Sequence, residues 1–184
     1  SFNLHEFPVD MVVSAQGNTI LAISQHGYIQ TYNVKNGKTW KIDIKTSLTV
    51  CAISENGQRF IAGGPSGEMF FYEGEEYKKK SLSVNSIRSC AISPDGNLVI
   101  SAGNARDKES AIQVQSWEGD ALALISVPAP VNTLIFDQKA DYFFVALKNG
   151  EMWRIKVGSF EVDREILVTR KEALIDICTL RSGD

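Results

Sequence analysis

The sequence predicts an all-β protein, a β-propeller of four-stranded antiparallel blades. A segment that combines a short apolar run with a turn recurs along the chain at a nearly constant interval. Runs that alternate between apolar and polar residues, as half-buried strands do, follow each copy of this segment. No stretch shows the 3.6-residue periodicity of an amphipathic helix.

The repeated segment occurs four times and is followed by a fifth, partial copy. Its turn position is held by Gly17, Gly57, Gly96, Ala140 and Gly183. The spacings between these anchors are 40, 39, 44 and 43 residues. A period of about 40 to 45 residues with four strands per unit is characteristic of propeller blades.

Each unit contains the strands that a blade needs. A first strand precedes the turn, and second strands are predicted over Thr19–Ser24, Arg59–Ala62, Leu98–Ala102 and Tyr142–Leu147. Third strands alternate in polarity, as in Gly27–Asn33 and Gly150–Lys156. Fourth strands, which are more polar, are predicted over Thr39–Ile44, Lys80–Val84, Ala121–Val127 and Arg164–Val168.

The segment from Ala91 to Gly103, Ala-Ile-Ser-Pro-Asp-Gly-Asn-Leu-Val-Ile-Ser-Ala-Gly, resembles the first two strands of a WD40 repeat. The resemblance covers essentially the whole chain but is degenerate. The Trp-Asp pair of that family is replaced by Tyr32-Asn33, Tyr72-Glu73, Trp117-Glu118 and Ile155-Lys156, and its Gly-His dipeptide is absent. The resemblance therefore implies blades without the usual His–Asp network, held mainly by apolar packing. The Tyr32–Trp40 segment also resembles a pyrroloquinoline-quinone-type propeller repeat.

The repeat predicts a single partial WD40-like propeller domain over residues 1–184. Its blades are expected over residues 8–46, 47–86, 87–129 and 130–170, with 171–184 as the first strand of a further blade. Residues 2–7 fall where a preceding fourth strand is expected. End blades expose apolar faces that neighbours should cover. We therefore expect part of a larger ring, a fragment of a longer propeller or a half that another chain completes, and self-association of the isolated chain.

Composition argues against several classes of protein. A formal net charge of −3 lacks the basic footprint of a duplex nucleic-acid binder. No apolar run approaches the roughly 18 residues that a membrane span needs, and the first residues do not resemble a signal peptide. Three cysteines without CxxC spacing do not form a disulfide framework. These features predict reduced thiols, a cytoplasmic location and no nucleic-acid partner.

Possible chemical sites have simpler explanations. Cys51 and Cys90 occupy one column of adjacent repeats, which suits either a thiolate or metal pair or two small buried residues. The second explanation is favoured, because His5 and His26 add no metal-ligand spacing. Gly63–Gly67 lies between two strands and opens no helix, so a blade turn is favoured over a phosphate loop. Without a catalytic motif, we predict no enzymatic activity, cofactor or metal.

The longest departure from the repeat is a polar insertion after the second strand of the third blade. Its candidate protein-binding residues are Asn104, Arg106, Asp107, Lys108 and Glu109. Binding residues tend to lie on such loops of rigid scaffolds, although a tolerated, solvated insertion has the same composition. Elsewhere, the Glu73–Lys80 run predicts a hairpin supported by opposite charges, and Trp40 and Trp117 are expected to be partly exposed.

Three functions remain open at this stage. The first is a non-catalytic scaffold or sensor propeller that docks other proteins or other domains of its parent chain. The second is a structural segment that completes a larger propeller or coat and has no ligand of its own. The third is a cofactor-binding or small-molecule-binding propeller of an enzyme, indicated by the Tyr32–Trp40 segment alone. The lack of a catalytic constellation favours the first.

Overall fold

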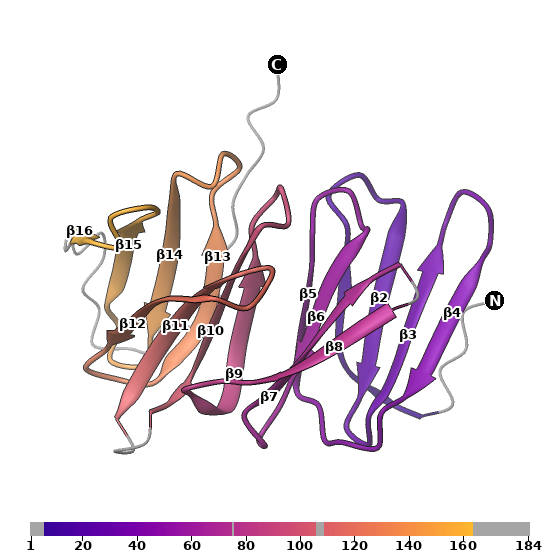
Figure 1. Cartoon of the computed structure of the whole chain (residues 1–184), viewed down its shortest axis with the longest axis horizontal. Helices are drawn as coiled ribbons and strands as arrows, with labels where there is room; N and C mark the ends of the chain where they lie inside the picture. Colours follow the sequence, from indigo (N-terminus) through magenta and orange to yellow (C-terminus); the bar gives the residue numbers. More distant parts are fainter. Residues whose placement is uncertain (1–5, 75, 106–108, 164–184) are drawn as a thin grey trace.

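A computed structural model describes residues 6–74, 76–105 and 109–163 of the chain. These residues form sixteen strands and no helix, arranged as four antiparallel four-stranded sheets (Figure 1). The prediction of an all-β propeller with four-stranded blades is therefore confirmed. The strands expected over Arg164–Val168 and within residues 171–184 lie outside the described residues, and so do residues 1–5 of the strand expected at the start.

Each sheet follows the chain order, so that one blade is completed before the next begins. Blade 1 consists of β1 (Pro8–Val13), β2 (Thr19–Ser24), β3 (Tyr28–Asn33) and β4 (Thr39–Asp43). Blade 2 consists of β5 (Val50–Ile53), β6 (Arg59–Gly63), β7 (Glu68–Glu73) and β8 (Glu76–Ser81). Blade 3 consists of β9 (Asn85–Ile92), β10 (Leu98–Asn104), β11 (Ser110–Ser116) and β12 (Ala121–Ser126). Blade 4 consists of β13 (Val131–Phe136), β14 (Tyr142–Leu147), β15 (Met152–Lys156) and β16 (Val162–Asp163).

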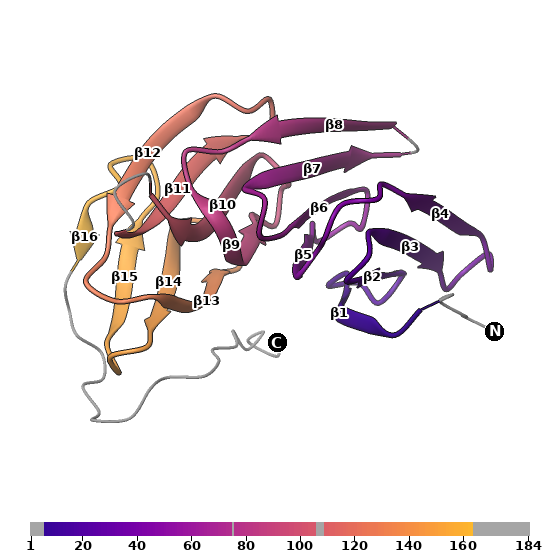
Figure 2. The same ribbon diagram turned by 90° about the horizontal axis from the view of Figure 1, so that it is seen from below.

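The four blades stand side by side in an arc, with blade 1 at one end and blade 4 at the other (Figures 1 and 2). The first strands β1, β5, β9 and β13 lie on the inner side of the arc, and contacts between successive blades run mainly through them. The fourth strands lie along the outside (Figure 2). A blade therefore has a leading face, toward the preceding blade, and a trailing face, toward the following one.

Apolar clusters fill the space between successive blades. Between blades 1 and 2, Leu21 and Ile29 on the trailing face of blade 1 meet Phe60 and Tyr72 on the leading face of blade 2. The rings of Phe60 and Tyr72 are stacked, with centroids 4.5 Å apart. Equivalent clusters lie between blades 2 and 3 and between blades 3 and 4. Both faces of the middle sheets are thus buried, which stabilises the arc by removing apolar area from water.

The turn between the first and second strands is built in the same way in every blade. A Ser or Asp side-chain oxygen accepts a hydrogen bond from the backbone N–H five residues later. The pairs are Ser14 with Thr19 (3.1 Å), Ser54 with Arg59 (3.1 Å), Ser93 with Leu98 (2.9 Å) and Asp137 with Tyr142 (3.1 Å). The anchor residues have positive φ: Gly17 (69°), Gly57 (74°), Gly96 (77°) and Ala140 (57°). Ala140 therefore takes a backbone conformation that favours glycine.

Two details differ from the sequence-based expectations. The fourth strand of blade 2 covers Glu76–Ser81, earlier than the expected Lys80–Val84, because Glu76 pairs with Glu73 across a tight hairpin. Trp117 is buried, and the expectation of its exposure was wrong. The Arg59 guanidinium lies 4.9 Å from the centroid of the Trp117 ring, and this contact bridges blades 2 and 3. Trp40 is half-buried, as expected.

The charged hairpin of blade 2 forms as predicted, but its ion pairs reach beyond the run itself. Lys79 Nζ lies 3.0 Å from Glu68 Oε1, within the same blade. Lys78 Nζ lies 3.6 Å from Glu118 Oε2, and Lys80 Nζ donates to the carbonyl oxygen of Glu118, both in blade 3. Lys78 and Lys80 of β8 therefore join two blades, whereas Lys79 joins the two strands of the hairpin.

The turn geometry predicts opposite effects of exchanging glycine and alanine. Gly17→Ala should destabilise the fold by about 1 kcal/mol, because a Cβ there meets no atom and only the positive φ is penalised. Gly57→Ala should cost more, because its Cβ would lie 2.6 Å from Thr19 Oγ1. Ala140→Gly should stabilise the fold by about 0.5 kcal/mol. Urea denaturation measures all three, and an Ala140→Gly variant that unfolds more easily would contradict this account.

Candidate functional site

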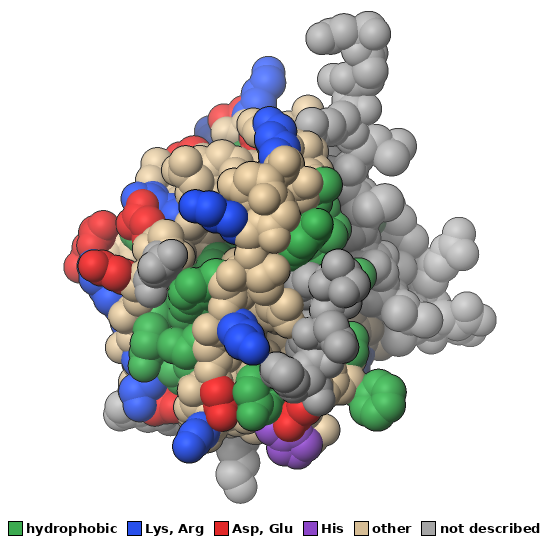
Figure 3. Space-filling view, turned by 90° about the vertical axis from the view of Figure 1, so that its right-hand side faces the viewer, with side chains coloured by type: hydrophobic (Ala, Val, Ile, Leu, Met, Phe, Trp, Pro, Cys, Tyr) green, Lys and Arg blue, Asp and Glu red, His purple; other side chains and the backbone are tan. Residues whose placement is uncertain are grey.

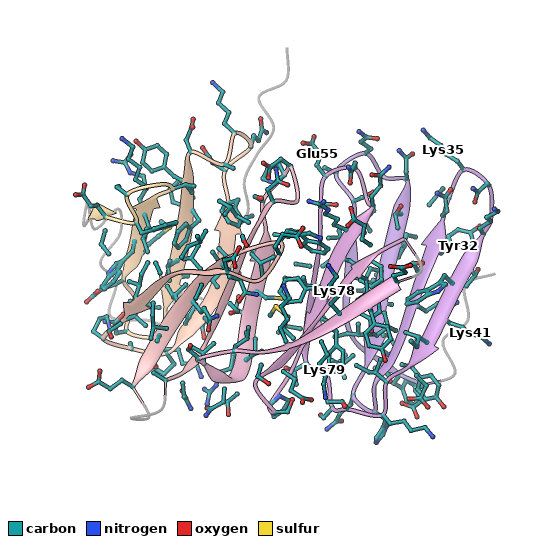
Figure 4. The ribbon with its side chains drawn as sticks, in the orientation of Figure 1. Tyr32, Lys35, Lys41, Glu55, Lys78 and Lys79 are labelled. Atoms are coloured by element: carbon teal, nitrogen blue, oxygen red, sulfur yellow. The ribbon has the colours of Figure 1, made fainter. Side chains whose placement is uncertain are left out.

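A cavity of about 670 Å³ lies on the inner side of the arc, at the end where the turns between first and second strands gather. We call it the channel cavity. Its walls are mostly apolar side chains of all four first strands, including Val12, Ile53, Ile92 and Phe136. Glu55, from the β5–β6 turn, stands at this end of the molecule (Figure 4). The size and apolar lining are those of a pocket that accepts a side chain or a short peptide segment.

The charge of the channel cavity comes from two carboxylates, Glu55 and Asp137. The described residues that line it include no Lys, Arg or His. The Glu55 backbone N–H donates to the Pro94 carbonyl oxygen at 3.2 Å, which ties the turn of blade 2 to that of blade 3. The Asp137 side chain closes its own turn by accepting from the Tyr142 N–H. This acidic rim on a rigid frame favours a ligand with positive charge or N–H donors.

Cys51 and Cys90 lie in the wall of the same cavity and are free cysteines. The Asp10 carboxylate accepts a hydrogen bond from the Cys51 backbone N–H at 2.8 Å and joins blade 1 to blade 2. Burial raises the pKa of the Cys51 thiol well above its usual value, and the nearby negative charge of Asp10 adds to this effect. Burial, and then Asp10, also raise the pKa of the Cys90 thiol. Both thiols are therefore neutral at physiological pH and weak nucleophiles.

Metal binding finds no support in the part of the chain that the structure describes. No three His, Cys, Asp or Glu side chains there are grouped so as to hold a metal ion. His26 Nδ1 instead lies 2.9 Å from Glu6 Oε2, which also accepts a hydrogen bond from the Ser24 hydroxyl. The hydrogen bond with His26 lowers the pKa of the Glu6 carboxyl. This cluster holds the segment before β1 against the β2–β3 turn.

Asn104 and Ser110, which flank the predicted binding loop, lie at the opposite end of blade 3 from its turn in the channel cavity (Figure 1). Asn104 pairs with Ser110 across the β10–β11 hairpin, and the Ala105 N–H donates to the Glu109 carbonyl oxygen at 2.8 Å. Arg106, Asp107 and Lys108 lie outside the described residues. Asn104 borders a small hollow that is also lined by Arg88 and Pro130. Asn104 and Glu109, the described candidate residues, therefore do not line the channel cavity.

Sequence reasoning did not identify the channel cavity. The residue that directly follows the turn Ser or Asp lines the cavity in every blade, namely Ala15, Glu55, Pro94 and Gln138. A search of the repeat for columns that face the central axis would have found this set. This search would have found Glu55 but not the second carboxylate of the rim, because Asp137 reaches the cavity from the neighbouring column.

The fold and cavity define this chain as a β-propeller protein. No family model matches the sequence, and no curated protein matches it either. Among solved structures, a chain of hydrazine synthase from Kuenenia stuttgartiensis is similar, with a TM-score of 0.71 and 15% sequence identity. The match covers 85% of this chain and 48% of the other, so this chain spans about half of that length. As 1319 solved chains match, and identity here is low, the likeness shows the propeller fold alone.

No helix of the described residues is long and apolar enough to cross a membrane. The WD40-like character of the repeats remains a prediction from the sequence. The cytoplasmic location also remains a prediction from the sequence.

The raised thiol pKa values predict slow chemistry at both cysteines. In a Cys178→Ser background, an aromatic disulfide reagent at pH 7 should label Cys51 and Cys90 at least about a hundredfold more slowly in the folded protein than in denaturant. Labelling is followed by absorbance, with the denatured protein as the control. Fast labelling of the folded protein at neutral pH would mean that at least one thiol is reactive.

Proposed function

We propose that this chain is a non-catalytic protein-interaction module that docks a segment of a partner protein in the channel cavity. The segment is apolar and carries a Lys or Arg side chain. One observation carries the proposal: the cavity has apolar walls, two carboxylates and no basic group among its described lining residues. A basic side chain anchored by apolar neighbours satisfies both features at once.

The rigidity of the cavity supports a docking role. Its rim consists of short turns that are closed by side-chain hydrogen bonds, and two of these turns are joined by the Glu55–Pro94 hydrogen bond. A preorganised surface binds a flexible peptide with a smaller entropic cost than a mobile one. Neutral thiols in the wall contribute apolar contact and weak hydrogen bonding.

The alternatives make different demands on the molecule. A purely structural segment needs no cavity with a uniform charge. A cofactor-binding enzyme needs convergent polar groups, and the Tyr32–Trp40 segment that resembles a cofactor-binding repeat does not line the channel cavity. The absorbance and metal content of the purified protein test that alternative directly.

The decisive experiment compares partner capture by three variants, followed by mass spectrometry. Glu55→Lys places a positive charge on the rim and should weaken capture at least about tenfold, because it repels the basic segment. Glu76→Lys is the matched control, since Glu76 is also exposed but lies on the β7–β8 hairpin. It should leave capture unchanged.

The third variant tests the predicted loop. If Arg106→Ala/Asp107→Ala/Lys108→Ala abolishes capture and Glu55→Lys does not, the docking surface is the loop and not the cavity. Recovery of nothing but further parts of the parent protein with every variant would instead favour the structural alternative.

A further inference from the structure

The four first strands are equivalent, but one of them is not covered. Met11, Cys51, Cys90 and Leu134 occupy the same place on the leading faces of the four blades. Cys51 and Leu134 are each 5% exposed, because the preceding blade packs on them. Met11 has no preceding blade among the described residues and is 57% exposed.

The same contrast extends along β1. Val13 is 52% exposed, whereas Ile92 and Phe136 at the equivalent place in blades 3 and 4 are 7% and 5% exposed. Val9, near the start of the same strand, is also exposed. Figure 3 shows this end of the molecule, where hydrophobic side chains reach the surface at several places. A contiguous apolar strip of this kind marks a contact surface.

At the other end of the arc, no blade follows blade 4 among the described residues. On the trailing faces of blades 1 to 3, Leu21, Ile61 and Ile100 are completely buried. The equivalent Phe144 of blade 4 is only half-buried. The neighbouring Met152 is half-buried as well, whereas Met69 at the equivalent place in blade 2 has no exposed surface.

We propose that a second copy of this chain covers both open faces. Blade 4 of each copy packs its trailing face, with Phe144 and Met152, on the leading face of blade 1 of the other copy, with Met11 and Val13. The two four-bladed arcs thereby close one ring through two equal contacts.

The observations favour a second copy over an unrelated partner. Every leading face that is covered in this molecule is covered by the trailing face of another blade. In the part of the chain that the structure describes, one copy leaves open one leading and one trailing face, so two copies together can cover all four open faces.

The test uses the unmodified 184-residue chain and its three methionines, Met11, Met69 and Met152. Native mass spectrometry should give a dimer at micromolar concentration. Peroxide oxidises exposed methionines, so oxidation of Met11 and Met152 should slow severalfold as the concentration rises and the dimer forms. Met69, which is buried within the arc, should stay protected throughout.

A charge at the contact provides the second readout. Met11→Lys should weaken dimerisation at least about tenfold, because the new charge loses its hydration in the contact. Leu124→Lys is the matched control: Leu124 is 53% exposed but lies on the outer strand β12 of blade 3, which packs between blades 2 and 4 and carries neither open face. It should leave the dimer intact. Circular dichroism reports whether each variant folds.

Three results would overturn the proposal. One is a chain that stays monomeric at all concentrations with Met11 freely oxidised. Another is a dimer that tolerates Met11→Lys, since its contact must then lie elsewhere. The third is open growth into larger polymers, because head-to-tail contacts that fail to close a ring propagate. The proposal is separable from the proposed function, because Glu55→Lys tests capture without altering β1.

Discussion

The packing of one blade on the next is the interaction on which the rest of this structure depends. A four-stranded sheet has two faces and no other layer of its own, so its apolar residues are buried only by neighbouring sheets. Leu21 and Ile61 illustrate this, since each is fully buried by the following blade. Polar contacts between blades add to this packing and fix how the blades align. Examples are the hydrogen bond from the Cys51 N–H to Asp10 and the contact of the Arg59 guanidinium with the Trp117 ring. Because each apolar face needs a neighbouring blade, the exposed apolar residues of β1 indicate where a further contact forms.

Packing between blades also creates the channel cavity. The first strands converge on the inner side of the arc, and their turns are held in one conformation by the recurring Ser or Asp hydrogen bond. Residues such as Glu55 and Gln138 are therefore presented at the same place in each blade. The backbone conformation of the turn is thus the same in every blade, while the side chain that each turn presents at the rim of the channel cavity differs. Docking and ring closure then use adjoining parts of the same repeated unit, and Val13 belongs to both.

Much of the fold could be predicted because its signals are local. The bounds of β2 and β14 coincide with the predicted Thr19–Ser24 and Tyr142–Leu147, since alternation and turn residues mark both ends of these strands. Prediction was weakest where partners come from other blades. The burial of Trp117, which follows β11 in blade 3, depends on its contacts with Phe71 and Arg59 of blade 2, which no local pattern encodes. The candidate loop was found as an insertion, but the separation of its described residues from the channel cavity was not visible.

By itself, the sequence determined the class of fold, the number of complete blades and the turn that each blade repeats. These follow from periodicity and from residues whose backbone preferences act over a few positions. Only the tertiary structure decided that Glu55 and Asp137 share one cavity and that Cys51 and Cys90 are neutral wall residues. It also decided that Met11 is exposed where Cys51 and Leu134 are not. Burial and charge at these places depend on which blade lies next to which, and that neighbourhood exists only once the blades have packed.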